Sequence, residues 1–176
     1  MDRTVYRERK RLQTLALTAL FAALVFVTTF FSVPAPLVGN INLGDSMVLL
    51  GTFVLGPWGA ISAGLGAALC DITNGYAMYA PATLVIKALM ALAAAGLVQV
   101  FSHTRLPRRV GLIIAGICAE AIMVFGYFAY EALPLQYGLA AAANMPLNAI
   151  QGVCGIVIAV PVEALISHLV GKRTKS

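Results

Sequence analysis

The chain has 176 residues, of which 60% are hydrophobic and only 11% are charged. A soluble globular domain carries about 25% charged residues, so this composition excludes an ordinary soluble domain and indicates an integral membrane protein. Six helices of about 20 residues each would use most of the chain. We therefore expect a single integral membrane domain over residues 1–176.

The net charge of +5 comes from basic clusters that alternate with long apolar runs. Only Lys87 of the 12 Lys and Arg residues lies outside the clusters at 3–11, 105–109 and 172–175. A nucleic-acid-binding protein gathers its cations on one soluble face, so no nucleic-acid partner is expected. Clusters facing the cytoplasm are typical of a multi-pass protein of the cell membrane. This predicts a cytoplasmic N-terminus (1–11) and a cytoplasmic tail (171–176).

Apolar runs separated by turn residues predict an all-α bundle of six transmembrane helical segments within residues 12–170. The first three segments are expected at 12–31, 47–55 and 58–72. The second and third are short for complete spans and are either tilted or a re-entrant pair. The last three are expected at 82–101, 110–130 and 139–170, with Pro146 and Pro161 kinking the final helix.

The loops and helix starts between these segments follow from turn residues. Residues 32–44 and 73–81 are expected to form outer loops, because they are rich in Pro, Gly and Asn. Asp45 is expected to cap the N-terminus of the second segment. The small residues Ala60, Gly64 and Ala68 form a ladder that predicts close helix packing around the third segment.

The sequence contains no signature of catalysis, of metal binding or of a cofactor site. It has no Walker-type phosphate loop, no His-Glu-x-x-His pair and no Gly-x-Ser-x-Gly elbow. Cys70, Cys118 and Cys154 lie in apolar stretches and lack the Cys/His spacing of a zinc site. We therefore expect no catalytic residue, no metal and no cofactor, and the chain is not expected to be an enzyme.

The informative residues are the polar side chains within the apolar runs, because an ionisable group inside a span costs at least about 2.5 kcal/mol and usually faces a cavity or a partner. With a rise of about 1.5 Å per residue, these side chains gather at the outer end, opposite the basic clusters. The candidate ligand-binding residues are Asn42, Asp71, Asn74, Tyr76, Tyr79, Lys87, Tyr127, Glu131, Asn144, Asn148 and Gln151. Such a set is typical of a pocket for a small planar ligand.

Purely structural roles compete with this interpretation. The tyrosines could anchor the chain at the membrane interface, and the amides of the last segment, which recur at i, i+4 and i+7 on one face, could bond only to other helices. Lys87 could form an ion pair with Asp71 that merely ties two helices together. Glu120 lies near mid-span and could line the pocket floor or pair internally, whereas Glu163 lies near the cytoplasmic end.

The first segment has no polar face for a ligand but repeats small residues. Ala19 and Ala23 lie four residues apart, with Ala16 and Ala22 nearby. An Ala-x-x-x-Ala stripe permits another helix to approach closely in the bilayer. The approaching helix belongs either to another protein or to the same bundle.

Seven short motifs follow one another along the chain: Asn42-Leu43-Gly44-Asp45, Leu55-Gly56-Pro57-Trp58-Gly59, Gly64-Leu65-Gly66, Asp71-Ile72, Gly75-Tyr76, Tyr79-Ala80-Pro81-Ala82-Thr83 and Ile86-Lys87. With the chain's size, its six segments and its basic N-terminus, they resemble the substrate-binding (S) components of energy-coupling factor (ECF) transporters. The resemblance covers nearly the whole chain. It is nearest to the riboflavin-type branch, which also contains members proposed to take pyridoxine or thiamine precursors.

The resemblance implies a vitamin-binding subunit that works with a transmembrane coupling (T) subunit and two ABC-type ATPases. An S component of this kind is expected to bind its vitamin from outside and to topple in the bilayer as ATP is used. The resemblance assigns T-subunit docking to Ala19 and Ala23, and a mobile loop over the ligand to Asn40–Asn42.

Two other functions stay open at this point. One is a self-sufficient secondary transporter. The other is a small lipid-modifying membrane enzyme with Lys87, Asp71 and Glu131 as its acid/base set. The charges in the predicted pocket do not by themselves choose among the vitamins.

Overall fold

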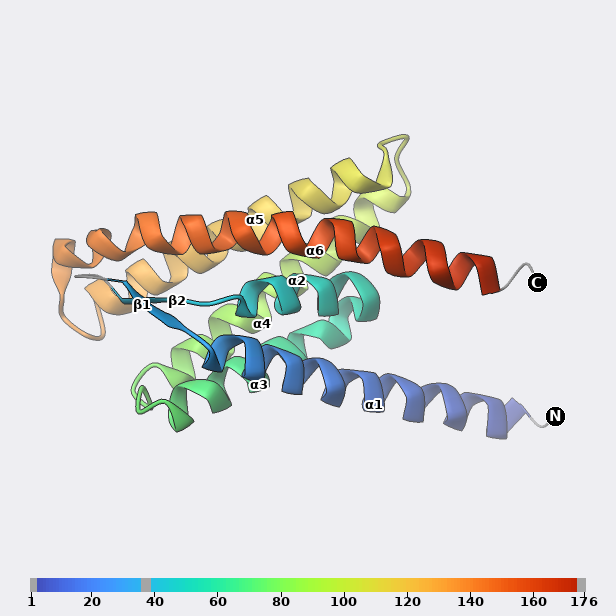
Figure 1. Ribbon diagram of the computed structural model, residues 1–176, viewed down its shortest axis with the longest axis horizontal. Coiled ribbons are helices and arrows are strands. Elements are labelled where there is room, and N and C mark those ends of the chain that lie inside the picture. Colours follow the sequence, from blue (N-terminus) through green and yellow to red (C-terminus); the bar gives the residue numbers. More distant parts are fainter. Residues whose placement is uncertain (1–2, 36–38, 174–176) are drawn as a thin grey trace.

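The computed structural model describes residues 3–35 and 39–173, which form helices and one short β-hairpin (Figure 1). Residues 1–2, 36–38 and 174–176, which fall in the predicted N-terminal segment, outer loop and tail, lie outside the described part. In chain order the elements are α1 (Arg3–Phe30), β1 (Val33–Ala35), β2 (Gly39–Ile41), α2 (Gly44–Leu55), the 3-10 helix η1 (Gly56–Trp58), α3 (Gly59–Thr73), α4 (Ala80–Ser102), α5 (Arg108–Ala132), the 3-10 helix η2 (Gly138–Asn144) and α6 (Met145–Arg173).

An α-helix occupies each of the six predicted segments within the described residues. Five stretches are long and apolar enough to cross a membrane, with residues 44–73 counted as one of them. The helices α2 and α3 have 12 and 15 residues, fewer than the about 20 needed for an upright span. That these two helices are either tilted spans or a re-entrant pair stays a prediction.

Helix α1 begins at Arg3, well before the predicted start of the first segment at residue 12. The basic N-terminal stretch therefore forms the first turns of the helix. Arg, Lys, Glu and Gln are good helix formers, and the apolar run that follows continues the same helix without a breaker. The change from polar to apolar residues predicted the start of the apolar run. It did not predict the start of the helix, which includes the polar residues before that run.

The outer loop predicted for residues 32–44 contains two short antiparallel strands. Val33 pairs with Ile41 and Ala35 pairs with Gly39. Val and Ile are β-branched and favour extended backbone, whereas the Pro and Gly residues of this stretch masked the strand pattern in the sequence. The hairpin leads directly into α2.

The last predicted segment also differs from the structure at its start. Residues 138–144 form the 3-10 helix η2, and α6 begins only at Met145. Pro146 has no N–H, and its ring would collide with the carbonyl of Ala142 in a continuous α-helix. Pro146 therefore lies in the first turn of α6, where proline is tolerated, and the interior proline of α6 is Pro161.

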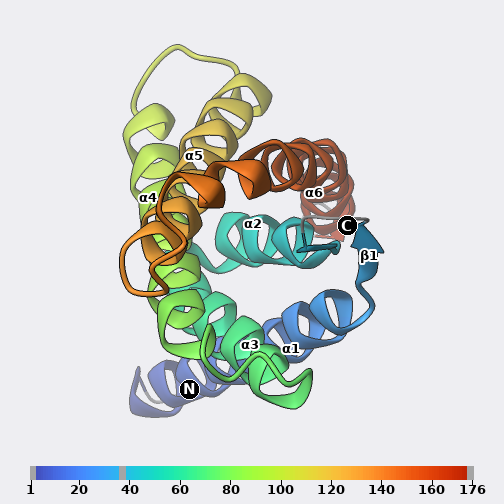
Figure 2. The ribbon, with the colours of Figure 1, turned by 90° about the vertical axis from the view of Figure 1, so that its left-hand side faces the viewer.

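Helix α2 lies at the centre of the bundle, with the longer helices around it (Figure 2). Nine of its twelve residues are buried, among them Val48 and Leu49. A helix that is apolar on all sides is stable only when it is enclosed. Because α2 is enclosed, a polar side chain near its first turn is held inside the protein rather than in water.

Small residues set the close approach of α3 to its two neighbours. A Cβ built on Gly66 would collide with the carbonyl oxygen of Ala22 in α1 and lie 2.9 Å from Cβ of Val25. A Cβ built on Gly64 would lie 2.9 Å from the carbonyl oxygen of Leu84 in α4. Gly64 of the ladder predicted for the third segment therefore packs against α4, whereas Gly66, which was not part of that ladder, packs against α1.

The two ends of the molecule differ in chemistry. Both described chain ends and the connection between α4 and α5, which carry the basic clusters, lie toward one end (Figure 1). The hairpin, the turn at 74–79 and the turn at 133–137 lie toward the other. At the basic end Arg108 Nη2 donates to Glu163 Oε1 over 2.6 Å, so Glu163 lies away from the predicted pocket, as expected.

Candidate ligand-binding site

A cavity of about 200 Å³ lies at the end of the bundle that carries the hairpin. All eleven predicted ligand-binding residues line it: Asn42, Asp71, Asn74, Tyr76, Tyr79, Lys87, Tyr127, Glu131, Asn144, Asn148 and Gln151. The remaining lining residues are Thr29, Ser32, Gly44, Val48, Ala67, Thr83 and Leu147. Side chains that are far apart in the sequence therefore meet around one space, and none of the eleven is scattered to another face.

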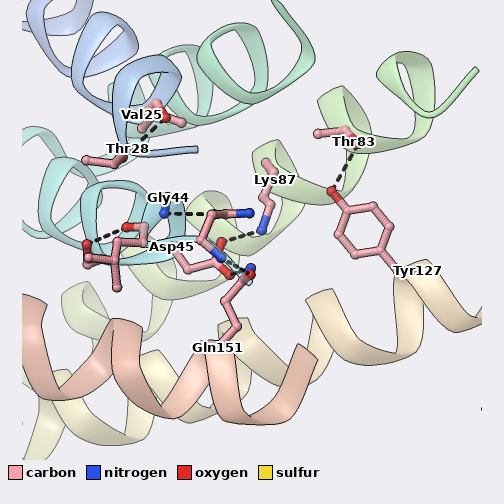
Figure 3. A network of polar contacts seen from close by, with 11 residues as sticks. Val25, Thr28, Gly44, Asp45, Thr83, Lys87, Tyr127 and Gln151 are labelled. Atoms are coloured by element: carbon pink, nitrogen blue, oxygen red, sulfur yellow. Dashed lines mark hydrogen bonds and ion pairs between the residues drawn. The ribbon is translucent and has the colours of Figure 1, made fainter. Parts of the chain in front are cut away.

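A buried ionic network lies beside the cavity and includes two of its lining residues, Lys87 and Gln151 (Figure 3). Lys87 Nζ from α4 forms an ion pair with Oδ1 of Asp45 in α2. Gln151 Nε2 from α6 donates to the other oxygen of Asp45 over 2.6 Å. Gln151 Oε1 in turn accepts the backbone N–H of Asn42 over 3.0 Å. The network joins α2, α4 and α6 to the residue that follows the hairpin.

This network corrects two expectations about Asp45 and Lys87. Asp45 is not an N-cap, because α2 begins at Gly44 and Leu43 stands at its cap without a side-chain bond. Lys87 pairs with Asp45 rather than with Asp71. Asp45 was not predicted as a site residue, because a carboxylate at the start of a helix is typical of a cap. The available signal was that Asp45 opens an almost wholly apolar helix.

Asp71 lies on a second wall, formed by α3, α4 and α5. Tyr127 donates its hydroxyl to Thr83 over 3.0 Å, and the Thr83 side chain lies beside the Asp71 carboxylate. The Oδ2 atom of Asp71 is buried and has no hydrogen-bond partner among the described residues. The Tyr127 ring also lies beneath the Lys87 ammonium, with its centroid 5.6 Å from Nζ, which is within cation–π range.

Glu131 lies on a third wall, between the end of α5 and η2. Asn144 Nδ2 donates to Glu131 Oε2 over 2.7 Å, and the Tyr79 side chain lies beside the same carboxylate. Burial raises the pKa of the Tyr79 phenol above its ordinary value, and the nearby Glu131 carboxylate raises it further. Tyr79 is therefore a neutral hydrogen-bond donor at physiological pH.

Aromatic rings and amides complete the lining. The rings of Tyr76 and Tyr79 meet edge to face with centroids 6.4 Å apart. Asn148 makes no hydrogen bond to another described residue and keeps its amide available to the cavity. The three amides that were expected on one helix face do converge on the cavity, but Asn144 reaches it from η2 rather than from α6.

Residues 9–168 match the family model described as "ECF-type riboflavin transporter, S component". The chain belongs to this family. The family resemblance predicted from the sequence motifs is therefore confirmed, and the chain is a multi-pass membrane protein of a transporter family rather than of an enzyme family.

Two individual proteins are similar to this S component. It is 33% identical over 141 residues to a protein of Pyrococcus woesei described as "Uncharacterized protein in gap 3'region", covering 77% of this chain and 88% of that protein. It shares its fold with the S component of a bacterial ECF transporter, with a TM-score of 0.68 and 20% identity over 91% of this chain and 98% of the other.

Glu120 lies deeper in the S component than the cavity. It is buried, and neither of its carboxylate oxygens has a hydrogen-bond partner among the described residues. Its side chain packs against α6, where Gly152 and Gly155 leave room. A Cβ on Gly152 would lie 2.8 Å from one carboxylate oxygen of Glu120, and a Cβ on Gly155 would lie 3.3 Å from the other. Neither expected role holds for Glu120, because it does not line the cavity and does not pair within the described part of the chain.

The small residues of α1 separate onto two faces. Ala22 is half-buried and its carbonyl faces Gly66 of α3, so it packs within the bundle. Ala16, Ala19 and Ala23 are exposed. The sequence left open whether the small residues of α1 contact another protein or the same bundle. In the structure Ala22 packs within the bundle, whereas Ala16, Ala19 and Ala23 lie on an exposed face.

Proposed function

We propose that this S component captures a small water-soluble vitamin of the riboflavin, pyridoxine or thiamine-precursor class in the cavity, and that it delivers the vitamin inward. The eleven cavity residues predicted from the sequence are proposed as its ligand-binding set. Delivery requires a T subunit and two ABC-type ATPases, as family membership suggests.

The observation that carries this proposal is the convergence of costly polar groups on one cavity. Isolated charges and amides inside an apolar bundle are unfavourable unless they have partners or a function. Here two carboxylates, one ammonium, several amides and tyrosine rings from separate elements meet at one space, and the ammonium is paired with the buried Asp45 carboxylate behind it. Aromatic walls with a few convergent polar groups are typical of a small-molecule site.

The orientation proposed for the chain follows from its charges. Basic clusters lie toward the end that carries both described chain ends, and the cavity lies toward the other end. Because basic loops favour the cytoplasmic side, we place both termini in the cytoplasm and the cavity toward the outside. A vitamin then reaches the cavity past the hairpin and the turn at 74–79.

The exposed face of α1 is the proposed docking surface for the T subunit. Ala19 and Ala23 are exposed one helical turn apart on a helix that is otherwise apolar along its middle. Small side chains permit a partner helix to approach the backbone closely in lipid. The burial of Ala22 against α3 leaves Ala19 and Ala23 available to that partner.

The experiment that tests the proposed function has two parts. Isothermal titration of the purified, folded chain against a panel of vitamins and their precursors should find a ligand with submicromolar affinity. Proteoliposomes that contain the chain alone should bind this ligand without sustained uptake, and uptake should begin when the T subunit and ATPases are added with ATP. Sustained uptake by the chain alone would favour a secondary transporter, and the absence of any ligand would contradict the proposal.

A further inference from the structure

We propose that the ligand is a single aromatic ring that carries an amino group, and that it carries no phosphate or carboxylate. This inference rests on the proposed function, because it assumes that the cavity binds a vitamin or precursor. It goes further by selecting one chemical class from the three that the family resemblance leaves open. The cavity's size, its balance of charge and one unpartnered carboxylate oxygen carry the argument.

The cavity's size limits the ligand to one ring. Its volume is about 200 Å³, whereas sites for drug-sized molecules begin at about 300 Å³. Tyr76, Tyr79 and Tyr127 contribute rings to the lining, and a flat heterocycle can stack or meet edges there. A fused three-ring system with a polyhydroxyl chain needs more space than these walls leave.

The charge balance of the cavity disfavours an anion. Asp71 and Glu131 both line the cavity, and Lys87 is its only lining cation among the described residues. The Lys87 ammonium is already paired with Asp45, which is itself only 1% exposed. A phosphate or carboxylate would therefore approach two carboxylates without a free cation to compensate, and like charges in a site of low polarity repel strongly.

Asp71 supplies the acceptor for the proposed donor. Its Oδ2 atom is buried without a hydrogen-bond partner among the described residues, although Asp71 lines the cavity. An unpartnered buried carboxylate oxygen costs free energy that an amino group of the ligand would recover. The amide of Asn148, which also lines the cavity and has no bond to another described residue, can contact the ring's remaining polar atoms.

Paired ligands test each part of this inference by isothermal titration of the full chain. Pyridoxamine and pyridoxine compare an amine with a hydroxyl on the same ring, pyridoxamine 5′-phosphate adds an anion, and riboflavin adds two rings and a chain. A hydroxymethyl aminopyrimidine serves as a second single-ring amine. We expect a single-ring amine to bind tightest, with riboflavin and the phosphate ester each weaker by at least about tenfold.

The Asp71→Asn variant tests the acceptor and keeps the size of the side chain. We expect the preference for pyridoxamine over pyridoxine to fall by at least about tenfold, with pyridoxine affinity nearly unchanged. Glu8→Gln is the matched control, because Glu8 is exposed on the N-terminal part of α1, away from the cavity. Thermal unfolding of both variants checks that each is folded.

The outcomes separate this inference from the proposed function. Tightest binding of riboflavin, of pyridoxine or of the phosphate ester would overturn the inference and would leave vitamin capture standing. Equal losses for pyridoxamine and pyridoxine in Asp71→Asn would overturn the role of Asp71. If no compound of the panel binds to folded protein, the proposed function fails and this inference fails with it.

Discussion

The carboxylate of Asp45 in α2 and the ammonium of Lys87 in α4 form an ion pair inside the bundle, and Lys87 also lines the cavity (Figure 3). Their side chains are 1% and 8% exposed, so water screens neither charge. The pair also receives Gln151 from α6. One interaction therefore connects three helices and neutralises the only cation of the cavity lining among the described residues.

Breaking this pair from either side should destabilise the protein. Lys87→Met leaves the Asp45 carboxylate buried without a counter-charge, and removal of one partner of a buried pair costs about 3–5 kcal/mol. Asp45→Asn leaves the ammonium unpaired in the same way. Denaturant or thermal unfolding in detergent would measure both losses.

The double variant Asp45→Asn with Lys87→Met is the control for that prediction. It buries no unpaired charge, and the Asn carbonyl can still accept the hydrogen bond from Gln151. We expect the double variant to recover most of the stability that the single variants lose. We expect its ligand affinity to be lower than that of the wild type, because Lys87 lines the cavity. A double variant no more stable than the worse single variant would show that the pair is not the cause.

Gly66→Ala should loosen the contact between α1 and α3. The added methyl group meets the carbonyl oxygen of Ala22, which cannot move without displacing α1. Overpacking of this kind costs typically about 1–3 kcal/mol. The loss should be visible as a lower unfolding temperature and as lower yield of folded protein from membranes.

Gly96→Ala is the matched control for Gly66→Ala. A Cβ on Gly96 meets no heavy atom within 4 Å, and alanine favours a helix over glycine by about 1 kcal/mol. We expect its stability to be unchanged or slightly higher. If both substitutions reduce stability equally, the effect comes from the helices' backbone and not from the contact with Ala22.

Ala19→Trp and Ala23→Trp should abolish uptake without loss of ligand affinity. Both alanines are exposed and neither lines the cavity, so we expect a bulky ring there to block only an approaching partner helix. Titration measures binding, and proteoliposomes with the T subunit and ATPases measure uptake.

Ala22→Trp distinguishes the two faces of α1. Ala22 is half-buried and its backbone touches the position of Gly66, so this variant should lower stability and binding together. If Ala19→Trp or Ala23→Trp lowers ligand affinity as much as Ala22→Trp does, those residues belong to the folded core.

The stability of the protein should fall at high pH through Tyr79. Its raised pKa means that the folded state keeps the phenol proton where the unfolded chain loses it. The free energy of unfolding is therefore independent of this group well below pH about 10, the ordinary tyrosine value. Above that value the free energy of unfolding falls as pH rises, because the folded state binds more protons.

Tyr79→Phe should flatten this dependence. Thermal unfolding of wild type and variant over about pH 8 to 11 would compare the slopes, with Tyr6→Phe as the control because Tyr6 is exposed on α1. Equal slopes in wild type and Tyr79→Phe would mean that another group titrates.

The polar residues that line the cavity could be predicted from the sequence, because polar side chains in apolar helices have few favourable positions. Depth along each helix follows from the rise per residue, and the cost of exposing charge to lipid directs these side chains inward. These two constraints sufficed to select Asp71, Lys87, Glu131 and Gln151, which approach the cavity from four different helices.

The partners within the site could not be predicted in the same way. Lys87 had two carboxylates at comparable depth available, and only the central place of α2 brings Asp45 rather than Asp71 to it. Glu120 satisfied the same polarity rule and still lies outside the cavity, because Gly152 and Gly155 admit its side chain between α5 and α6.

Composition, charge and helical periodicity by themselves determined that this chain is a helical membrane protein with its basic residues gathered at one end and its polar residues at the other. These properties depend on one segment at a time, since each helix must match the thickness and low polarity of the bilayer. The tertiary structure decided which carboxylate neutralises Lys87, which alanines of α1 stay free, and how large the cavity is. Those properties depend on distances between helices, and such distances arise only when the whole bundle packs together.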